Sequence, residues 1–263
     1  MIPLIPFLLA GNQTPYNAVV PPFVNELLAE SNFGNPSKST SGQWTFTHSS
    51  RPARLIFQLQ EWGQPSPSPG NLGGVDKFSA ARDPKPENKR LLSGLKFGAG
   101  PAGHRQSYGE YGDNIVVGGV YSRCQLYLRY KVTKSDGRPV ATGYQEGDEE
   151  LFEGIARWTF GLLEGSHCGE TSMGFAGHNY PAFRDTEDKL HISASAFATN
   201  TGRTLTINRN AGRAYMSTAN GGVLLALGCP EVKIGSQWHP IKTVVMARND
   251  QILLPVELLS LIE

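Results

Sequence analysis

The last third of the chain is divided into short segments by turns rich in glycine and asparagine, which recur roughly every ten residues. Asn and Gly tolerate the positive φ angles that tight hairpins require, so these turns favour antiparallel strands over helices. The turns are Asn200–Gly202, Asn210–Gly212, Asn220–Gly222 and Asn249–Asp250. The strands expected between them are Leu190–Ala198, Arg203–Asn208, Arg213–Ser217, Gly222–Leu227, Ile241–Ala247 and Gln251–Pro255.

Strands are also expected in earlier segments of the chain, where apolar and polar residues alternate. The expected strands there are Gln43–His48, Arg54–Trp62, Asn114–Val120, Cys124–Val132 and Arg138–Thr142. A short helix is expected over residues 21–31, because two prolines suit its first turn and its apolar residues share one face. The predicted fold is mainly β: an antiparallel β-sandwich or jelly-roll-like domain with one packed α-helix and long loops.

The packed helix is expected to begin at Asp148, whose side chain suits an N-cap. Its apolar stripe, spaced at three or four residues, is Leu151, Ile155, Trp158 and Leu162. Gly165 is expected to end the helix, and Gly154 and Gly161 weaken it. The helix is therefore expected to depend on packing against the sheet.

The 263 residues are 39% hydrophobic, which is enough for one large β domain with a substantial core. Residues 1–20 are predicted to form an extended apolar arm, because Pro3, Pro6 and Pro15 oppose helix. Residues 21–263 are predicted to form a single β-rich domain with a long loop at 63–90, which is rich in Pro, Gly, Ser and charge. A domain boundary near residue 75 is the less favoured alternative.

The charges nearly cancel, with 24 Lys and Arg against 23 Asp and Glu. The chain therefore has no long-range field that would attract nucleic acid or an anionic membrane. Neither a signal peptide nor a transmembrane segment is expected from the apolar start. The three cysteines are far apart and are expected to be buried thiols in a reducing compartment, with one disulfide plus a free thiol as the alternative.

Residues 98–103 match the glycine pattern GxGxxG, but the segment that follows them is a poor helix. A phosphate-binding loop needs a helix there, and Pro101 removes one backbone donor. A glycine loop without nucleotide is the better interpretation.

Residues 166–191 contain His167, His178 and His191 together with several carboxylates, which are ligands that zinc, iron or manganese accept. Their spacing matches no rigid metal motif. A thiol enzyme would use Cys168 with His178 or His191 as its base. The more economical interpretation of the segment is a polar surface loop. No cofactor is expected, and a metal bound by the three histidines is the alternative.

Trp238 precedes His239 and Pro240 in a segment that resembles a loop, so it is the best exposed aromatic residue for sugar stacking. Tyr108 and Tyr111 are loop tyrosines that would complete such a site. A carbohydrate-binding β-sandwich module is therefore a second alternative.

Both ends of the chain are strongly apolar, although chain ends are usually polar and frayed. Such ends are covered by their own fold or by a neighbouring subunit. The interface residues expected for the second case are Ile2, Leu4, Ile5, Phe7, Leu8, Leu9, Leu258, Leu259, Leu261 and Ile262. The expected function is non-enzymatic: a structural subunit of a symmetric homo-oligomer, most concretely a capsid-type protein of a virion or phage.

Overall fold

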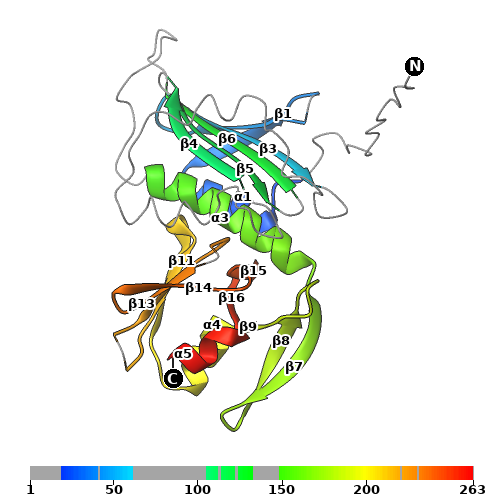
Figure 1. Cartoon of the computed structure of the whole chain (residues 1–263). Coiled ribbons are helices and arrows are strands. Elements are labelled where there is room, and N and C mark those ends of the chain that lie inside the picture. Colours follow the sequence, from blue (N-terminus) through cyan, green and yellow to red (C-terminus); the bar gives the residue numbers. More distant parts are fainter. Residues whose placement is uncertain are drawn as a thin grey trace, which may run out of the picture.

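The structure is a computed structural model, and the residues that it describes are 19–40, 42–61, 105–111, 114–121, 124–132, 148–219, 221–229 and 231–262. The predicted arm, apart from Val19 and Val20, lies outside these residues. So do the predicted loop at 63–90, the glycine motif at 98–103 and the predicted strand Arg138–Thr142. Figure 1 shows sheets stacked above and below a long central helix.

The upper layer is a six-stranded antiparallel sheet with the order β1-β2-β3-β6-β5-β4. Its strands are β1 (Phe33–Lys38), β2 (Trp44–His48), β3 (Ala53–Glu61), β4 (Arg105–Tyr111), β5 (Asn114–Tyr121) and β6 (Cys124–Val132). The predicted strands β2, β3, β5 and β6 are confirmed. In β3, Leu55, Phe57 and Leu59 are buried, as their alternation predicts.

The strands below the central helix form two five-stranded antiparallel sheets. One has the order β10-β11-β12-β13-β14, with strands β10 (Leu205–Asn208), β11 (Arg213–Met216), β12 (Val223–Ala226), β13 (Glu231–Ile234) and β14 (Gln237–Pro240). The other has the order β15-β16-β9-β8-β7, with strands β7 (Gly169–Phe175), β8 (His178–Arg184), β9 (Leu190–Ser193), β15 (Met246–Arg248) and β16 (Gln251–Pro255). The mainly β, sandwich-like fold class is therefore confirmed.

The central helix is α3 (Asp148–Ser166), which confirms the predicted helix. Trp158 is fully buried on it and donates from Nε1 to the backbone oxygen of Arg209, 2.8 Å away. The shorter helix α1 (Pro22–Glu30), also predicted, packs against α3 through Phe23, whose ring centroid lies 4.3 Å from that of Trp158. One continuous apolar core links α1, α3 and all three sheets.

The glycines of α3 permit close approach of backbone to backbone. A Cβ on Gly165 would lie 1.8 Å from the carbonyl oxygen of Ala247, and one on Gly154 would lie 2.0 Å from that of Asn210. Gly165 therefore lies within the helix, whereas the sequence predicted that it would end it. Glycine has a low helix propensity, but it is required at these positions because any side chain there would collide with the backbone of the lower half.

Other predicted elements also differ from the structure. Within Leu190–Ala198 only β9 is extended, and α4 (Ala194–Asn200) follows because the Ser193 hydroxyl caps it by accepting from the Ala196 N–H. Within Ile241–Ala247 only Met246 and Ala247 belong to a strand, β15. The polar segment 166–191 forms the end of α3, β7, β8 and the start of β9, and is not a loop.

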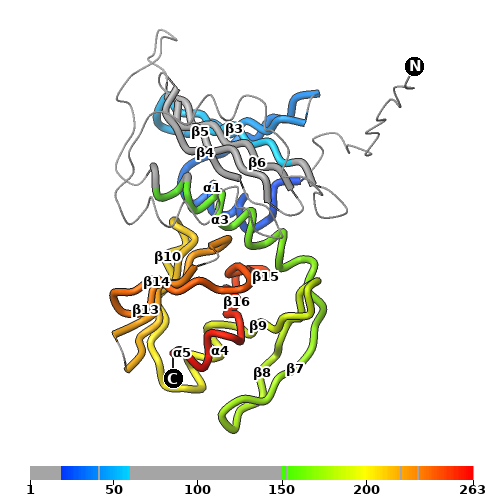
Figure 2. Tube along the Cα trace, viewed as in Figure 1, coloured from blue at the N-terminus to red at the C-terminus, as the bar shows by residue number. Residues whose placement is uncertain are grey.

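The carboxyl-terminal segment returns to the lower half of the molecule (Figure 2). The strand β16 lies between β15 and β9, and it is followed by the 3₁₀ turn η3 (Val256–Leu258) and the helix α5 (Leu259–Ile262). Arg203 donates from Nη2 to the backbone oxygen of Ile262, 2.9 Å away. This hydrogen bond ties Ile262 to the chain's own fold.

Candidate functional site

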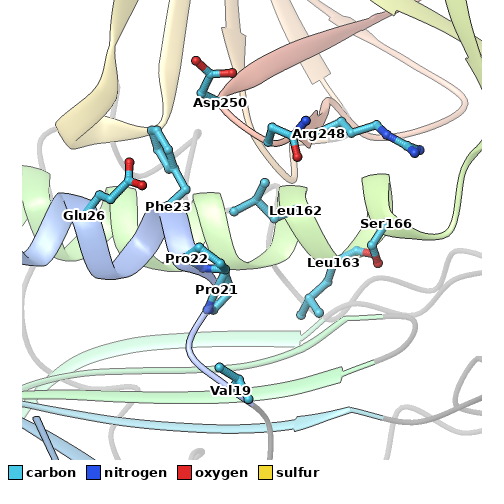
Figure 3. A pocket seen from close by; sticks show the side chains of 11 residues that line it. Val19, Pro21, Pro22, Phe23, Glu26, Leu162, Leu163, Ser166, Arg248 and Asp250 are labelled. Carbon is cyan, nitrogen blue, oxygen red and sulfur yellow. The ribbon is translucent and has the colours of Figure 1, made fainter.

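A pocket of about 750 Å³ opens between the start of α1, the end of α3 and the turn that joins β15 to β16 (Figure 3). Its volume falls within the range of about 300–1,000 Å³ that is typical of ligand sites. The lining residues come from these three segments. They are Val19, Pro21, Pro22, Phe23, Glu26, Leu162, Leu163, Ser166, Arg248, Asn249 and Asp250.

The backbone conformation of two pocket segments follows from their local sequence. Pro22 occupies the first position of α1, where the missing backbone N–H breaks no helical hydrogen bond. Pro21, the residue before the helix, is extended, with φ −52° and ψ 137°, so the backbone is not helical until Pro22. On the opposite wall, Asn249 adopts a φ of 55° in the two-residue turn between β15 and β16. Asparagine tolerates this left-handed conformation.

The pocket lining combines apolar side chains with two carboxylates. Phe23, Leu162 and Leu163 are the large apolar side chains of the lining, whereas Glu26 and Asp250 are exposed carboxylates (Figure 3). In the described part of the chain, no ion pair involves either carboxylate. The site therefore suits an apolar segment that also brings hydrogen-bond donors to these carboxylates.

The guanidinium of Arg248 is already engaged outside the pocket. It donates to the backbone oxygen of Cys168, 2.9 Å away, and to Glu170 Oε1, 2.8 Å away. The aliphatic part of the Arg248 side chain therefore lines the pocket. An anionic ligand would have to compete with these two acceptors.

The three histidines predicted as metal ligands lie in different environments. His167 is exposed just after α3, His178 is exposed at the β7–β8 hairpin, and His191 is fully buried in β9. Within the described ranges, no group of three or more His, Cys, Asp and Glu side chains is placed to hold a metal ion. The spacing in sequence therefore does not translate into a ligand cluster.

His191 instead forms a buried pair with Asp185. Its Nε2 lies 3.2 Å from Asp185 Oδ2, and because an ionised carboxylate only accepts, the histidine N–H is the donor. Burial raises the pKa of Asp185, but the hydrogen bonds from His191 and from the backbone N–H groups of Lys189 and Glu187 outweigh it and lower the pKa below its usual value. This pair holds the turn between β8 and β9.

Cys168 is a poor nucleophile in this environment. Burial, followed by the nearby negative charges of Asp185 and Glu164, raises the pKa of its thiol to about 11. Its sulfur lies 3.7 Å from the Met246 sulfur and the same distance from the Glu164 backbone oxygen. Because the thiolate is the reactive form, this site resembles a packed apolar cysteine and not an activated one.

Trp238 lies on the strand β14, not in a loop as the sequence predicted. It is half-buried and packs beside Ala226 and Cys229. In the strand register, Tyr215 pairs with Leu224, Leu224 with Lys233, and Lys233 with Trp238, so these four residues form one row across the outer face of the sheet. Sequence reasoning missed Tyr215, although its position between the buried Ala214 and Met216 indicates an outward side chain.

The ring of Tyr215 is held in place on this face. Its hydroxyl donates to the Gly221 backbone oxygen, 2.5 Å away, and a Cβ on Gly222 would collide with its ring. Tyr215 remains 47% exposed. The backbones of Tyr108 and Tyr111 belong to β4 in the upper sheet, so the structure does not bring them onto the sheet that carries Trp238.

The predicted interface residues divide into two groups. Leu258, Leu259 and Ile262 are buried in the core of their own chain, whereas Leu261 is 46% exposed. The amino-terminal six, from Ile2 to Leu9, lie outside the described residues. At the point where the described chain begins, Val20 is buried but Val19 is 70% exposed on the pocket wall.

Comparison with protein-family models, with curated proteins and with solved structures finds no match to this chain. None of the helices in the described segments is long and apolar enough to cross a membrane.

Proposed function

We propose that this protein is a structural subunit of a symmetric homo-oligomer, in which the apolar amino-terminal arm contacts a neighbouring copy. The concrete case that we propose is a capsid-type structural protein of a virion. The observation that carries the proposal is the exposure of Val19, an apolar residue at the root of an apolar arm. Apolar surface of this kind is stabilised when another surface removes it from water.

The two apolar ends contribute unequally to this proposal. The carboxyl-terminal leucines are largely covered within their own chain, and only Leu261 among the four predicted residues offers substantial exposed surface. The amino-terminal arm is therefore the principal contact, and Leu261 is a secondary one.

Mass photometry of the purified chain tests the proposal directly. We expect species much heavier than the 28.6 kDa single chain. Deleting residues 1–11 should shift them to lower mass, and the length-preserving variant Leu8→Asp/Leu9→Asp should do the same. The matched variant Leu261→Asp should have a smaller effect. A full-length chain that remains monomeric at micromolar concentration would reject the proposal.

Electron microscopy separates the capsid-type case from smaller assemblies. Closed shells or regular tubes are expected for a capsid-type protein. Discrete dimers or rings would contradict the virion assignment while leaving the homo-oligomer in place.

A second candidate function, carbohydrate binding, is favoured by the row of Tyr215, Leu224, Lys233 and Trp238. The two aromatic residues are three strands apart, which corresponds to about 14 Å. A sheet face with aromatic rings at both ends of the row and a Lys between them suits an extended neutral ligand such as an oligosaccharide.

A glycan array tests this second function. Binding should be lost in both Trp238→Ala and Tyr215→Ala, and retained in the control His178→Ala, which changes an exposed aromatic residue on another sheet. An array without signal for the full-length protein would exclude the sugars it contains as ligands.

A further inference from the structure

We infer that the pocket at the start of α1 receives the apolar segment Ile5–Leu9 from a second copy of the chain. This inference rests on the proposed assembly function and names the surface through which the arm acts. The pocket and the root of the arm share residues, since Val19, Pro21 and Pro22 line the pocket and also connect the arm to α1.

The chemistry of the arm matches the walls of the pocket. Residues 1–11 contain six large aliphatic or aromatic side chains besides Met1 and no charged side chain. The pocket lining includes Phe23, Leu162 and Leu163, which are apolar contacts for them. A Phe or Leu side chain moved from water into such a site contributes roughly 1.5–3 kcal/mol when it is fully covered.

The two carboxylates of the pocket lining suit the backbone of the same segment. Pro3 and Pro6 oppose helix in the arm, so its backbone N–H groups need acceptors outside the segment. Glu26 and Asp250 supply the carboxylates, with no ion pair to either in the described residues. These carboxylates can accept hydrogen bonds from an extended strand of the arm.

The length of the arm permits exchange between two copies. Ten residue-to-residue steps lead from Leu9 to Val19, which allows a reach of up to about 36 Å when extended. Because each pocket lies at the root of the same chain's arm, two copies that meet through this face across a two-fold axis can exchange arms reciprocally. Val19, which lies next to the arm in sequence, is 70% exposed beside the pocket, so a neighbouring copy has access to this face.

Photo-cross-linking of the full chain tests this inference. The variant Phe7→p-benzoylphenylalanine is prepared in ¹⁴N and ¹⁵N forms, mixed, allowed to exchange and irradiated. We expect mass spectrometry to find cross-links from position 7 to α1 or to Leu162 and Leu163 that join chains of different isotope composition. Cross-links only within one chain would overturn the second copy as occupant. If no cross-link reaches the pocket residues, the pocket is not the binding site of the arm.

A pocket-filling variant provides an independent measurement. Ser166 is exposed, lines the pocket and donates to the Leu163 backbone oxygen, so Ser166→Trp fills the site from its edge without changing the core. The control is Thr199→Trp, an exposed helical position on α4 outside the pocket. We expect Ser166→Trp to raise the concentration at half-dissociation about tenfold or more, and the control to leave it unchanged.

The outcomes distinguish this inference from the proposed function. If the wild-type chain assembles and depends on its arm, but Ser166→Trp assembles normally and the cross-links lie elsewhere, the function stands and the pocket assignment falls. If the wild-type chain is monomeric, the function falls together with the second copy as occupant. The cross-links then show whether the arm fills the pocket of its own chain.

Discussion

At the scale of single residues, the surroundings of Cys168 predict a chemically inert thiol. A pKa raised from 9.0 to about 11 lowers the thiolate fraction at neutral pH about a hundredfold. Iodoacetamide at pH 7.5 should therefore label the Cys168 peptide at least about a hundred times more slowly in the native protein than in urea. Labelling at comparable rates in both states would restore the thiol as a candidate nucleophile.

Asp185 gives a pH-dependent prediction. Because its pKa is lower in the folded protein than in the unfolded chain, the carboxylate stabilises the fold above about pH 4, and this contribution is lost as the pH falls through the lowered pKa. We expect Asp185→Asn to reduce the free energy of unfolding by about 1–3 kcal/mol at pH 7. The difference from wild type should shrink below pH 4 in urea titrations. A constant difference across this range would show that the charge of Asp185 is not involved.

At the scale of elements, the contact between α3 and the β15 segment depends on the missing side chain of Gly165. Gly165→Ala should destabilise the protein by about 2 kcal/mol or more, because its Cβ would collide with the Ala247 backbone, even though alanine favours helix. The control Gly169→Ala, in β7, has open space around its Cβ. Thermal unfolding should show a lower midpoint for the first variant only, and equal midpoints would contradict the close packing.

A buried ion network joins α3 to the sheet that contains β11. Glu153 accepts from Arg157 Nε at 2.6 Å and from Arg213 Nε at 3.1 Å, and Arg157 also donates to the Leu227 backbone oxygen at 2.9 Å. Glu153→Ala would leave Arg157 buried without its counter-ion and should cost about 3–5 kcal/mol in urea unfolding. The control Glu170→Ala removes the exposed partner of Arg248 and should cost less than about 1 kcal/mol. Similar losses in the two variants would contradict this assignment.

The elements that sequence reasoning found and missed differ in how they are buried. The strand β3 was predictable because one face is covered and its apolar residues alternate. The strand β7 is polar and largely exposed, so it lacks that alternation. Its hairpin with β8 turns through Ala176 and Gly177, which both have positive φ, and the glycine was the only local signal. The helix α4 depended on a serine cap, which a pattern of apolar residues does not reveal.

At the scale of the whole molecule, the pocket could not be predicted from the sequence. Its lining residues come from three segments that are spread over more than 200 positions of the chain, from Val19 to Asp250. The apolar character of residues 1–11 is evident from the sequence, but the pocket beside Val19 depends on how α1 and α3 pack. Tertiary contacts between distant segments define this site, and no local spacing encodes them.

The continuous core predicts that the described layers unfold together. The buried cluster includes Phe46 and Phe57 of the upper sheet, Trp158 of α3 and Leu253 of the lower sheets. The helix α3 packs within this cluster between the six-stranded sheet and the lower sheets. Loss of its packing should therefore unfold the upper and the lower sheets together. Urea unfolding followed by tryptophan fluorescence and by far-UV circular dichroism should give coincident midpoints, and Glu153→Ala should shift both midpoints equally. Two separated transitions, only one of them moved by that substitution, would show that the six-stranded sheet and the lower sheets are independent folding units.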